Sequence, residues 1–158
     1  MMVKTTETII GISIGTRFVG LAVIQNGTLI DFGVKTFLEA WSPEKLSRIL
    51  RVLETYIENY NITHIVIKRT HVSLASIGLT QLFKGITSLA ENLNIPYQPF
   101  TVDELKYYCN GASTKYALMQ YIFQKYPEVE KSTRLTNSNL NYVLKTVEAV
   151  SLADSMRY

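Results

Sequence analysis

The spacing of hydrophobic positions changes several times along the chain, and each change predicts an element of secondary structure. Short runs rich in Ile and Val, bounded by glycine or polar residues, are typical of buried strands. Such runs lie at Thr8–Ile14, Phe18–Ile24, Thr28–Phe37, Thr63–Arg69 and Ile95–Phe100. Gln25–Gly27 carries the Asn-Gly signal of a tight hairpin turn, so the first three strands form an antiparallel meander. The prolines within Ile95–Phe100 place that strand toward a sheet edge.

Apolar residues at helical spacing predict the helices. The first begins with Ser42 as N-cap, Pro43 at the first helical position and Glu44 in the first turn. The others are expected at Ser76–Leu93, Val102–Cys109, from a cap at Ser113 to Lys125, and Leu140–Ser155, with a polar loop at Lys131–Ser138. Three antiparallel strands followed by αβαβ units predict an α/β fold, with a mixed five-stranded sheet and helices on both faces.

Length and composition limit the classes of protein to which this chain could belong. The 158 residues suit a single domain, which we expect to span residues 1–158. The chain is 47% hydrophobic and 18% charged with ten tyrosines, which favours one covered face, as in a homodimer. A net charge of +3 permits nucleic-acid binding without requiring it. Cys109 is the only cysteine, which excludes an intrachain disulfide. No run is long and apolar enough to span a membrane and the N-terminus has no hydrophobic signal core, so we expect a cytoplasmic protein.

The stretch "GISIGTRFVGLAV" and the order of elements identify a family resemblance. The chain resembles the RuvC family of Holliday-junction resolvases, which have the RNase H-like fold. The resemblance rests on the glycines and Thr16 of this stretch, the later "HIVIKR", the helix start "GASTK" and the closing "TVEAVSLADS". The resemblance covers nearly the whole chain. The opening stretch is also similar to the phosphate loop of the actin and heat-shock ATPase fold. That fold needs two such domains, and this chain is long enough for one.

The resemblance implies a nuclease that uses two Mg²⁺ ions held by converging carboxylates. Carried onto this sequence, the acidic positions of the family fall on Ser13, Lys68, Lys145 and Glu148, so one carboxylate remains. A shift of the last helix by about a turn would bring in Asp154 instead. Other acids that could contribute are Glu7, Asp31, Glu39, Asp103 and Glu104, and the two histidines, His64 and His71, flank the fourth strand.

Electrostatics argue against metal at these positions. A lysine ammonium about 4 Å from a dication is repelled by roughly 8 kcal/mol at an effective dielectric constant near 20, and a neutral serine offers no compensation. We therefore expect no metal and no other cofactor. We also expect Lys68 or Lys145 to form an ion pair with Glu148.

Several residues could contact nucleic acid. Arg17, Lys68, Arg69, Lys115 and Lys145 could form a basic floor for a DNA backbone, although scattered solvated charges are an equally good interpretation. Val72 and Leu74 stand where the family inserts a loop into the junction, although a simple connection explains them too. A further set of basic and aromatic residues could track a strand, with packing expected for most of the tyrosines: Lys106, Lys115, Lys125, Lys131, Tyr107, Tyr108, Tyr116 and Tyr121.

These observations predict a catalytically inactive RuvC-like protein that binds branched DNA, such as a four-way junction, without cleaving it. The resemblance further implies a homodimer through the helix Ser76–Leu93. Two alternatives stay open. One is an active Mg²⁺-dependent junction endonuclease with relocated acids, and the other is a protein-interaction module that kept only the fold.

Overall fold

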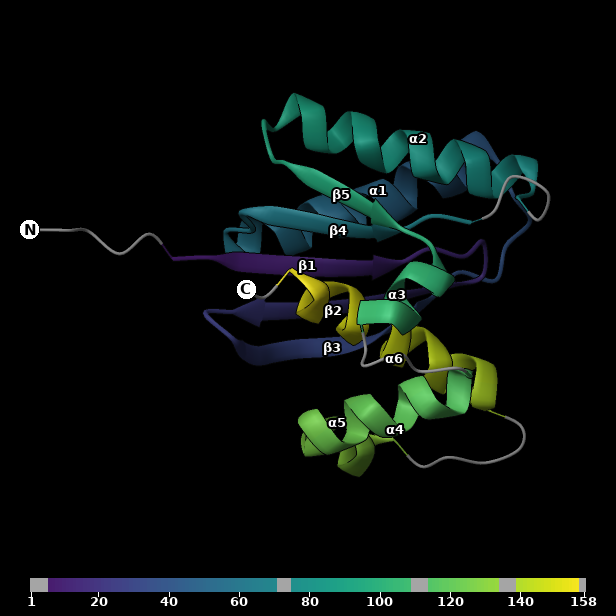
Figure 1. The fold of residues 1–158 in the computed structure, drawn as a ribbon. Helices are drawn as coiled ribbons and strands as arrows, with labels where there is room; N and C mark the ends of the chain where they lie inside the picture. Colours follow the sequence, from purple (N-terminus) through teal and green to yellow (C-terminus); the bar gives the residue numbers. More distant parts are fainter. Residues whose placement is uncertain (1–5, 71–74, 109–113, 134–138, 157–158) are drawn as a thin grey trace, which may run out of the picture.

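The computed structural model describes residues 6–70, 75–108, 114–133 and 139–156, and they form one mixed sheet between two layers of helices (Figure 1). The strands are β1 (Thr8–Ser13), β2 (Phe18–Gln25), β3 (Thr28–Thr36), β4 (His64–Lys68) and β5 (Tyr97–Phe100). Their order in the sheet is β3-β2-β1-β4-β5. β2 pairs antiparallel with both β1 and β3, whereas β4 pairs parallel with β1 and β5. The predicted mixed sheet and the edge position of the proline-bearing strand are confirmed.

The hairpin between β2 and β3 turns at the Asn-Gly dipeptide. Asn26 and Gly27 have φ angles of 48° and 83°, so both lie in the left-handed region that a two-residue turn of this kind requires. The turn is therefore set by local sequence, as predicted.

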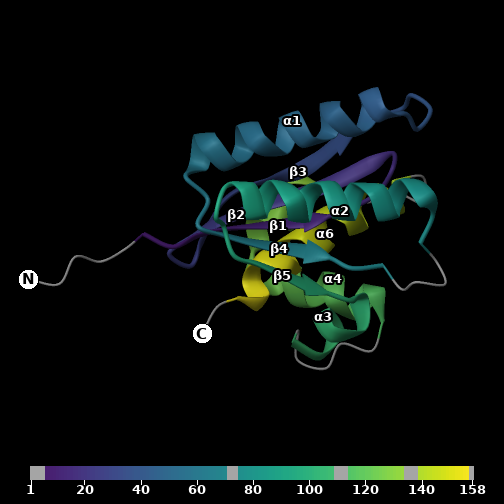
Figure 2. The same ribbon diagram turned by 90° about the horizontal axis from the view of Figure 1, so that it is seen from above.

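One face of the sheet carries α1 (Pro43–Tyr60) and α2 (Ile77–Asn92), which run side by side over it (Figures 1 and 2). The hydroxyls of Ser42 and Ser76 cap these helices by accepting from the backbone N–H groups of Lys45 and Leu79. The apolar side of α2, which the sequence left open as core or dimer interface, packs largely into the core of its own chain. Leu82 and Ile86 are buried there, and Leu79, Phe83 and Leu89 pack against the same cluster.

The other face carries α3 (Val102–Tyr108), α4 (Lys115–Lys125), α5 (Pro127–Ser132) and α6 (Leu140–Ser155) (Figure 1). α6 lies against β1 and β2 at very short range. A Cβ added to Gly11 would stand 2.1 Å from the Ala149 carbonyl oxygen, and one added to Gly20 would stand 2.2 Å from that of Lys145. Since these positions must lack a side chain, the two glycines determine how closely α6 approaches the sheet.

Two boundaries differ from expectation. The cap of α4 is Thr114, whose hydroxyl accepts from the Ala117 N–H, and not Ser113, which lies outside the described residues. The loop expected from Lys131 is also wrong at its start, because α5 extends to Ser132. Pro127 at the start of α5 and acids in its first turn repeat the start signal of α1, so the sequence held this information.

Among the described residues, no helix has the length and apolar character that a membrane crossing requires.

Candidate functional site

The four positions that the resemblance singled out meet at one end of the sheet. Ser13 ends β1 and Lys68 ends β4, and because these strands are parallel neighbours their carboxyl ends lie together. Lys145 and Glu148 follow each other by about one turn on α6, which crosses the sheet at this point. The predicted convergence of residues from three elements is therefore present.

Glu148 stands at the centre of the group. Its carboxylate lies with Oε2 3.0 Å and Oε1 3.2 Å from the Lys68 ammonium, and it accepts a 3.0 Å hydrogen bond from the Ser13 hydroxyl. Ser13 is fully buried and Glu148 is 6% exposed. An ion pair with Glu148 was predicted for Lys68 or Lys145, and the structure assigns it to Lys68. The Glu148 carboxylate is therefore already engaged by a positive charge.

Lys145 is bonded differently. Its ammonium donates a 2.6 Å hydrogen bond to the Ile14 carbonyl, and the side chain is half-buried. Burial lowers its pKa to about 8, helped by the nearby charges of Lys68 and Lys115 and opposed by that of Glu148. The charged amine is thus held in a place where a neighbouring anion would stabilise it.

A cavity of about 150 Å³ opens beside these groups. It is lined by Lys68, Lys115, Leu118, Asn141, Leu144, Lys145 and Glu148. Three ammonium groups face one carboxylate, so the cavity has an excess of positive charge, and the Asn141 amide adds a further donor group. Such a site attracts an anion with several acceptor oxygens, of which a phosphate is the type that Lys commonly binds.

The same residues do not fit Mg²⁺. That ion prefers carboxylate and water oxygens in a near-octahedral arrangement. Among the residues that the structure describes, no group of three or more His, Cys, Asp and Glu side chains could hold a metal. At this site the one carboxylate is already paired with an ammonium, and a second ammonium stands near it.

The acids that could have restored a metal site are engaged elsewhere. Asp154, which a shift of the last helix would have brought in, accepts 2.5 Å and 2.8 Å hydrogen bonds from the Tyr126 hydroxyl and the Lys125 ammonium. Burial acts to lower the pKa of Lys125, but its hydrogen bond and charge interaction with Asp154 outweigh this and the pKa is raised. Asp31 accepts from the Tyr60 hydroxyl at 2.6 Å, which raises the pKa of Tyr60 to about 12.

The remaining candidates have local roles. Glu39 pairs with Arg48 at 2.5 Å, and Glu104 accepts from the backbone N–H and the hydroxyl of Thr101 at the start of α3. The His64 ring lies 2.9 Å from the Thr63 hydroxyl. Glu7 and Asp103 do not line the cavity. His71, Val72, Leu74 and Cys109 lie outside the described residues.

The five predicted DNA-contacting residues separate in space. Lys68, Lys115 and Lys145 line the cavity, whereas Arg17 is exposed and lies over the ring of Phe18 at 5.8 Å. Arg69 lines a different groove on the opposite face of the sheet. The basic floor is therefore a cluster of three lysines with Arg17 and Arg69 outside it.

Exposed tyrosines lie on the elements that carry the cavity and on α3. Tyr107 on α3 is 79% exposed and Tyr116 on α4 is 58% exposed, so the expectation that packing claims most of the tyrosines fails for these two. Tyr142 on α6 is 40% exposed and stands edge-on to Phe18, with ring centroids 5.9 Å apart. Such rings can stack on unpaired bases.

Sequence reasoning missed three members of the cavity wall, Leu118, Asn141 and Leu144. Asn141, Lys145 and Glu148 are separated by four and then three residues, which places them on one face of α6. That spacing was a usable signal for Asn141. Leu118 carries no comparable signal, because only the packing of α4 against α6 places it there.

No protein-family model and no curated protein sequence matches the chain. Solved structures do match. RuvC of Thermus thermophilus in complex with a Holliday junction substrate has a TM-score of 0.73 at 12% identity, covering 94% of this chain and 91% of its own. The yeast mitochondrial Holliday junction resolvase Ydc2 has a TM-score of 0.67 at 13% identity, covering 93% and 76%. The fowlpox virus resolvase with Holliday junction DNA has a TM-score of 0.55 at 12% identity, covering 96% and 99%. The chain has the RuvC-like form of the RNase H-like fold. Its strand order, its two helix layers and its likeness to these solved structures all support this.

Proposed function

We propose that this protein binds DNA, with four-way junctions as the preferred form, and does not cleave it. The observation that carries the proposal is a cavity in which three lysines, Lys68, Lys115 and Lys145, surround one carboxylate that is already paired. In this arrangement the cavity receives a backbone phosphate directly, whereas a metal-dependent nuclease would hold that phosphate through its ions. The exposed Tyr116 and Tyr142 follow the cavity residues Lys115 and Asn141 in sequence and offer rings for unpaired bases.

The preference for junctions is supported by the likeness in fold. Two of the similar structures, from Thermus thermophilus and fowlpox virus, contain Holliday junction DNA. We infer a cytoplasmic protein acting on DNA in recombination or repair. We also infer a homodimer in which exposed Ile77 and Leu93, at the two ends of α2, contribute to the interface. Sedimentation of the wild type and of Ile77→Ser tests the dimer, with a shift toward monomer expected in the variant.

A gel-shift assay on four-way junction, duplex and single-stranded DNA, with and without Mg²⁺ or Mn²⁺, tests the function. We expect retention of the junction at lower protein concentration than duplex, no cleavage with either ion, and weakening as salt rises. Lys115→Gln removes one ammonium of the cavity from an exposed position, so it should weaken binding without unfolding the protein. Lys35→Gln, at an exposed position of the edge strand β3, is the matched control and should change binding less.

Each alternative predicts a different result. Metal-dependent cleavage would establish an endonuclease with relocated acids. Absence of binding to all three DNA forms at low salt would favour the protein-interaction module.

A further inference from the structure

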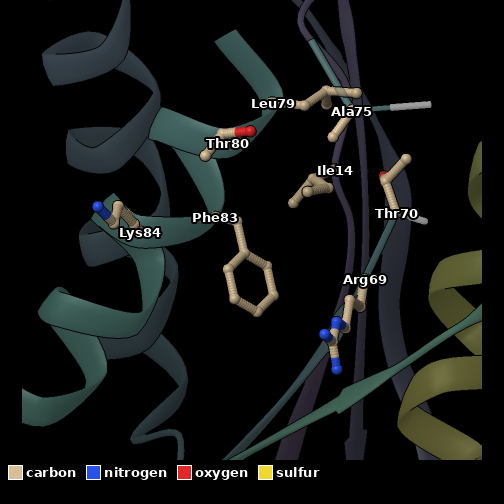
Figure 3. Close-up of a pocket in the computed structure, with 8 residues that line it drawn as sticks. All are labelled: Ile14, Arg69, Thr70, Ala75, Leu79, Thr80, Phe83 and Lys84. Atoms are coloured by element: carbon tan, nitrogen blue, oxygen red, sulfur yellow. The ribbon is translucent and has the colours of Figure 1, made fainter. Parts of the chain in front are cut away.

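The cavity that Lys68, Lys115 and Lys145 line is called the lysine cavity below, and a second, larger hollow lies on the opposite face of the sheet. It has a volume of about 390 Å³ and is lined by Ile14, Arg69, Thr70, Ala75, Leu79, Thr80, Phe83 and Lys84. We call it the α2 groove. Figure 3 shows the Phe83 ring projecting from α2 toward the strands, with Ile14 across from it and Arg69 extending below. Lys84 points away from the ring in this view, so Arg69 is the cation nearest the apolar centre.

The two hollows share the ends of the same two strands. Lys68 lines the lysine cavity, and the next residue, Arg69, lines the α2 groove because successive side chains of an extended chain point to opposite faces. The Ile14 carbonyl accepts from the Lys145 ammonium, while the Ile14 side chain lines the groove. Both hollows therefore lie at the ends of β1 and β4, one on each face of the sheet.

The lining suits a flat, largely apolar group that carries polar edges. The half-buried Phe83 offers a ring face, and Ile14 and Leu79 supply aliphatic surface. Arg69 and Thr70 supply donors at the side nearest the strands. A nucleobase has this character, since every base has a π-face and hydrogen-bonding edges. The volume lies within the roughly 300–1,000 Å³ that is usual for small-ligand sites.

We propose that the α2 groove takes one unpaired nucleobase of the DNA whose backbone occupies the lysine cavity. This inference rests on the proposed function and deepens it. It means that the protein selects DNA with unpaired or openable bases, such as the crossover of a four-way junction, over continuous duplex. Charge complementarity favours DNA as the occupant, because Arg69 and Lys84 at the groove and three lysines across the sheet all favour a polyanion.

The test uses the full chain and oligonucleotides with 2-aminopurine in place of one base, either single-stranded or at the crossover of a four-way junction. Insertion of that base beside Phe83 should change its fluorescence on binding. Phe83→Leu keeps the apolar packing but removes the ring, and should weaken binding to these DNAs by on the order of tenfold while leaving fully paired duplex unchanged. The matched control is Phe123→Leu, which changes a half-buried phenylalanine in the core of the opposite face.

A second variant keeps the test decisive if Phe83→Leu lowers folding stability. Thr80→Phe fills the groove from an exposed position on α2 and should have the same effect on binding and on the fluorescence change. Its sedimentation should match that of the wild type, which separates this effect from the dimer contact inferred for α2. The inference is overturned if both variants bind 2-aminopurine DNA as the wild type does, or if they weaken duplex binding equally. It is also overturned if wild-type protein binds DNA in a lysine-dependent way with no change in fluorescence. If the wild type binds no DNA at all, the proposed function fails first and this inference fails with it.

Discussion

The ammonium of Lys68, at the end of β4, and the carboxylate of Glu148, in the middle of α6, form an ion pair with a separation of 3.0 Å. The Ser13 hydroxyl donates to the same carboxylate. Eighty residues of sequence separate the two charged partners, so the pair ties the sheet to the helix that covers it. Removing either charge alone leaves the other side chain without its ion-pair partner in a poorly solvated place.

Restoring the acids should restore metal binding. The variant Ser13→Asp/Lys68→Glu/Lys145→Asp would place three new carboxylates beside Glu148, and their mutual repulsion should lower the melting temperature without metal. We expect Mg²⁺ or Mn²⁺ to raise that temperature in the triple variant and to leave the wild type unchanged, because only the variant has a hard-oxygen ligand set. Calorimetric scans with and without metal check this. Ser13→Asp alone is the control, since one added acid cannot outweigh two lysines, and an equal metal effect in the wild type would contradict the prediction.

Glu148→Gln should destabilise the fold by about 3 kcal/mol, because it leaves the Lys68 ammonium in a poorly solvated place without its counter-charge. Lys68→Met/Glu148→Gln should lose less than the sum of the two single changes, since neither charge remains unpaired. Urea denaturation of the three variants measures both effects. Strict additivity would show that the ion pair contributes little.

The stability of the fold should depend on pH through Lys145. Its pKa in the folded protein is about 8, below the 10.5 of a free lysine. Below pH 8 the amine is charged in both states and the cost of burying the charge is fully present. Between pH 8 and 10.5 the folded protein binds fewer protons than the unfolded chain, so the free energy of unfolding rises with pH.

Urea denaturation at several pH values, compared with Lys145→Met, isolates this contribution. The wild type should gain up to about 3 kcal/mol relative to the variant across that interval, at about 1.4 kcal/mol for each unit of pKa. Parallel curves for the two proteins would refute the assignment.

The affinity for DNA should fall as the pH rises, because it depends on the charge of the same Lys145 amine. As the pH rises through 8, the unliganded protein loses the Lys145 charge and with it an attraction to phosphate, so the dissociation constant should increase. The increase should be steeper than in Lys145→Gln, which carries no charge at any pH. Fluorescence anisotropy with labelled junction at constant ionic strength, from pH 7 to pH 9.5, provides the measurement. Identical pH profiles would place the phosphate away from Lys145.

Asp154 should act in folding and not in DNA binding. Asp154→Asn weakens the contacts with Tyr126 and Lys125 that hold the end of α4 against α6, and should destabilise the fold by about 2 kcal/mol. At temperatures where the variant remains folded, its affinity for junction DNA should equal that of the wild type. A specific loss of DNA affinity or of metal-dependent cleavage would instead return Asp154 to the functional site.

Most of the fold could be predicted because its signals are local. Apolar runs bounded by glycine located the strands, Ser42 and Pro43 located the start of α1, and the Asn26-Gly27 dipeptide located the hairpin. α5 was missed although Pro127 carries a start signal, because it is short and follows α4 without a loop. The convergence of Ser13, Lys68, Lys145 and Glu148 was predictable from the resemblance, since it depends only on the order of the elements.

What the sequence by itself determined is the fold class and the loss of acidic residues at the family's positions, because both are properties of residue type and spacing. The tertiary structure decided which lysine pairs with Glu148, since Lys68 reaches the carboxylate from β4 while Lys145 on α6 bonds to Ile14. It also placed the neighbours Lys68 and Arg69 in different hollows on opposite faces of the sheet. The choice of lysine depends on distances of a few ångströms between elements far apart in sequence, which the close packing of α6 over Gly11 and Gly20 determines.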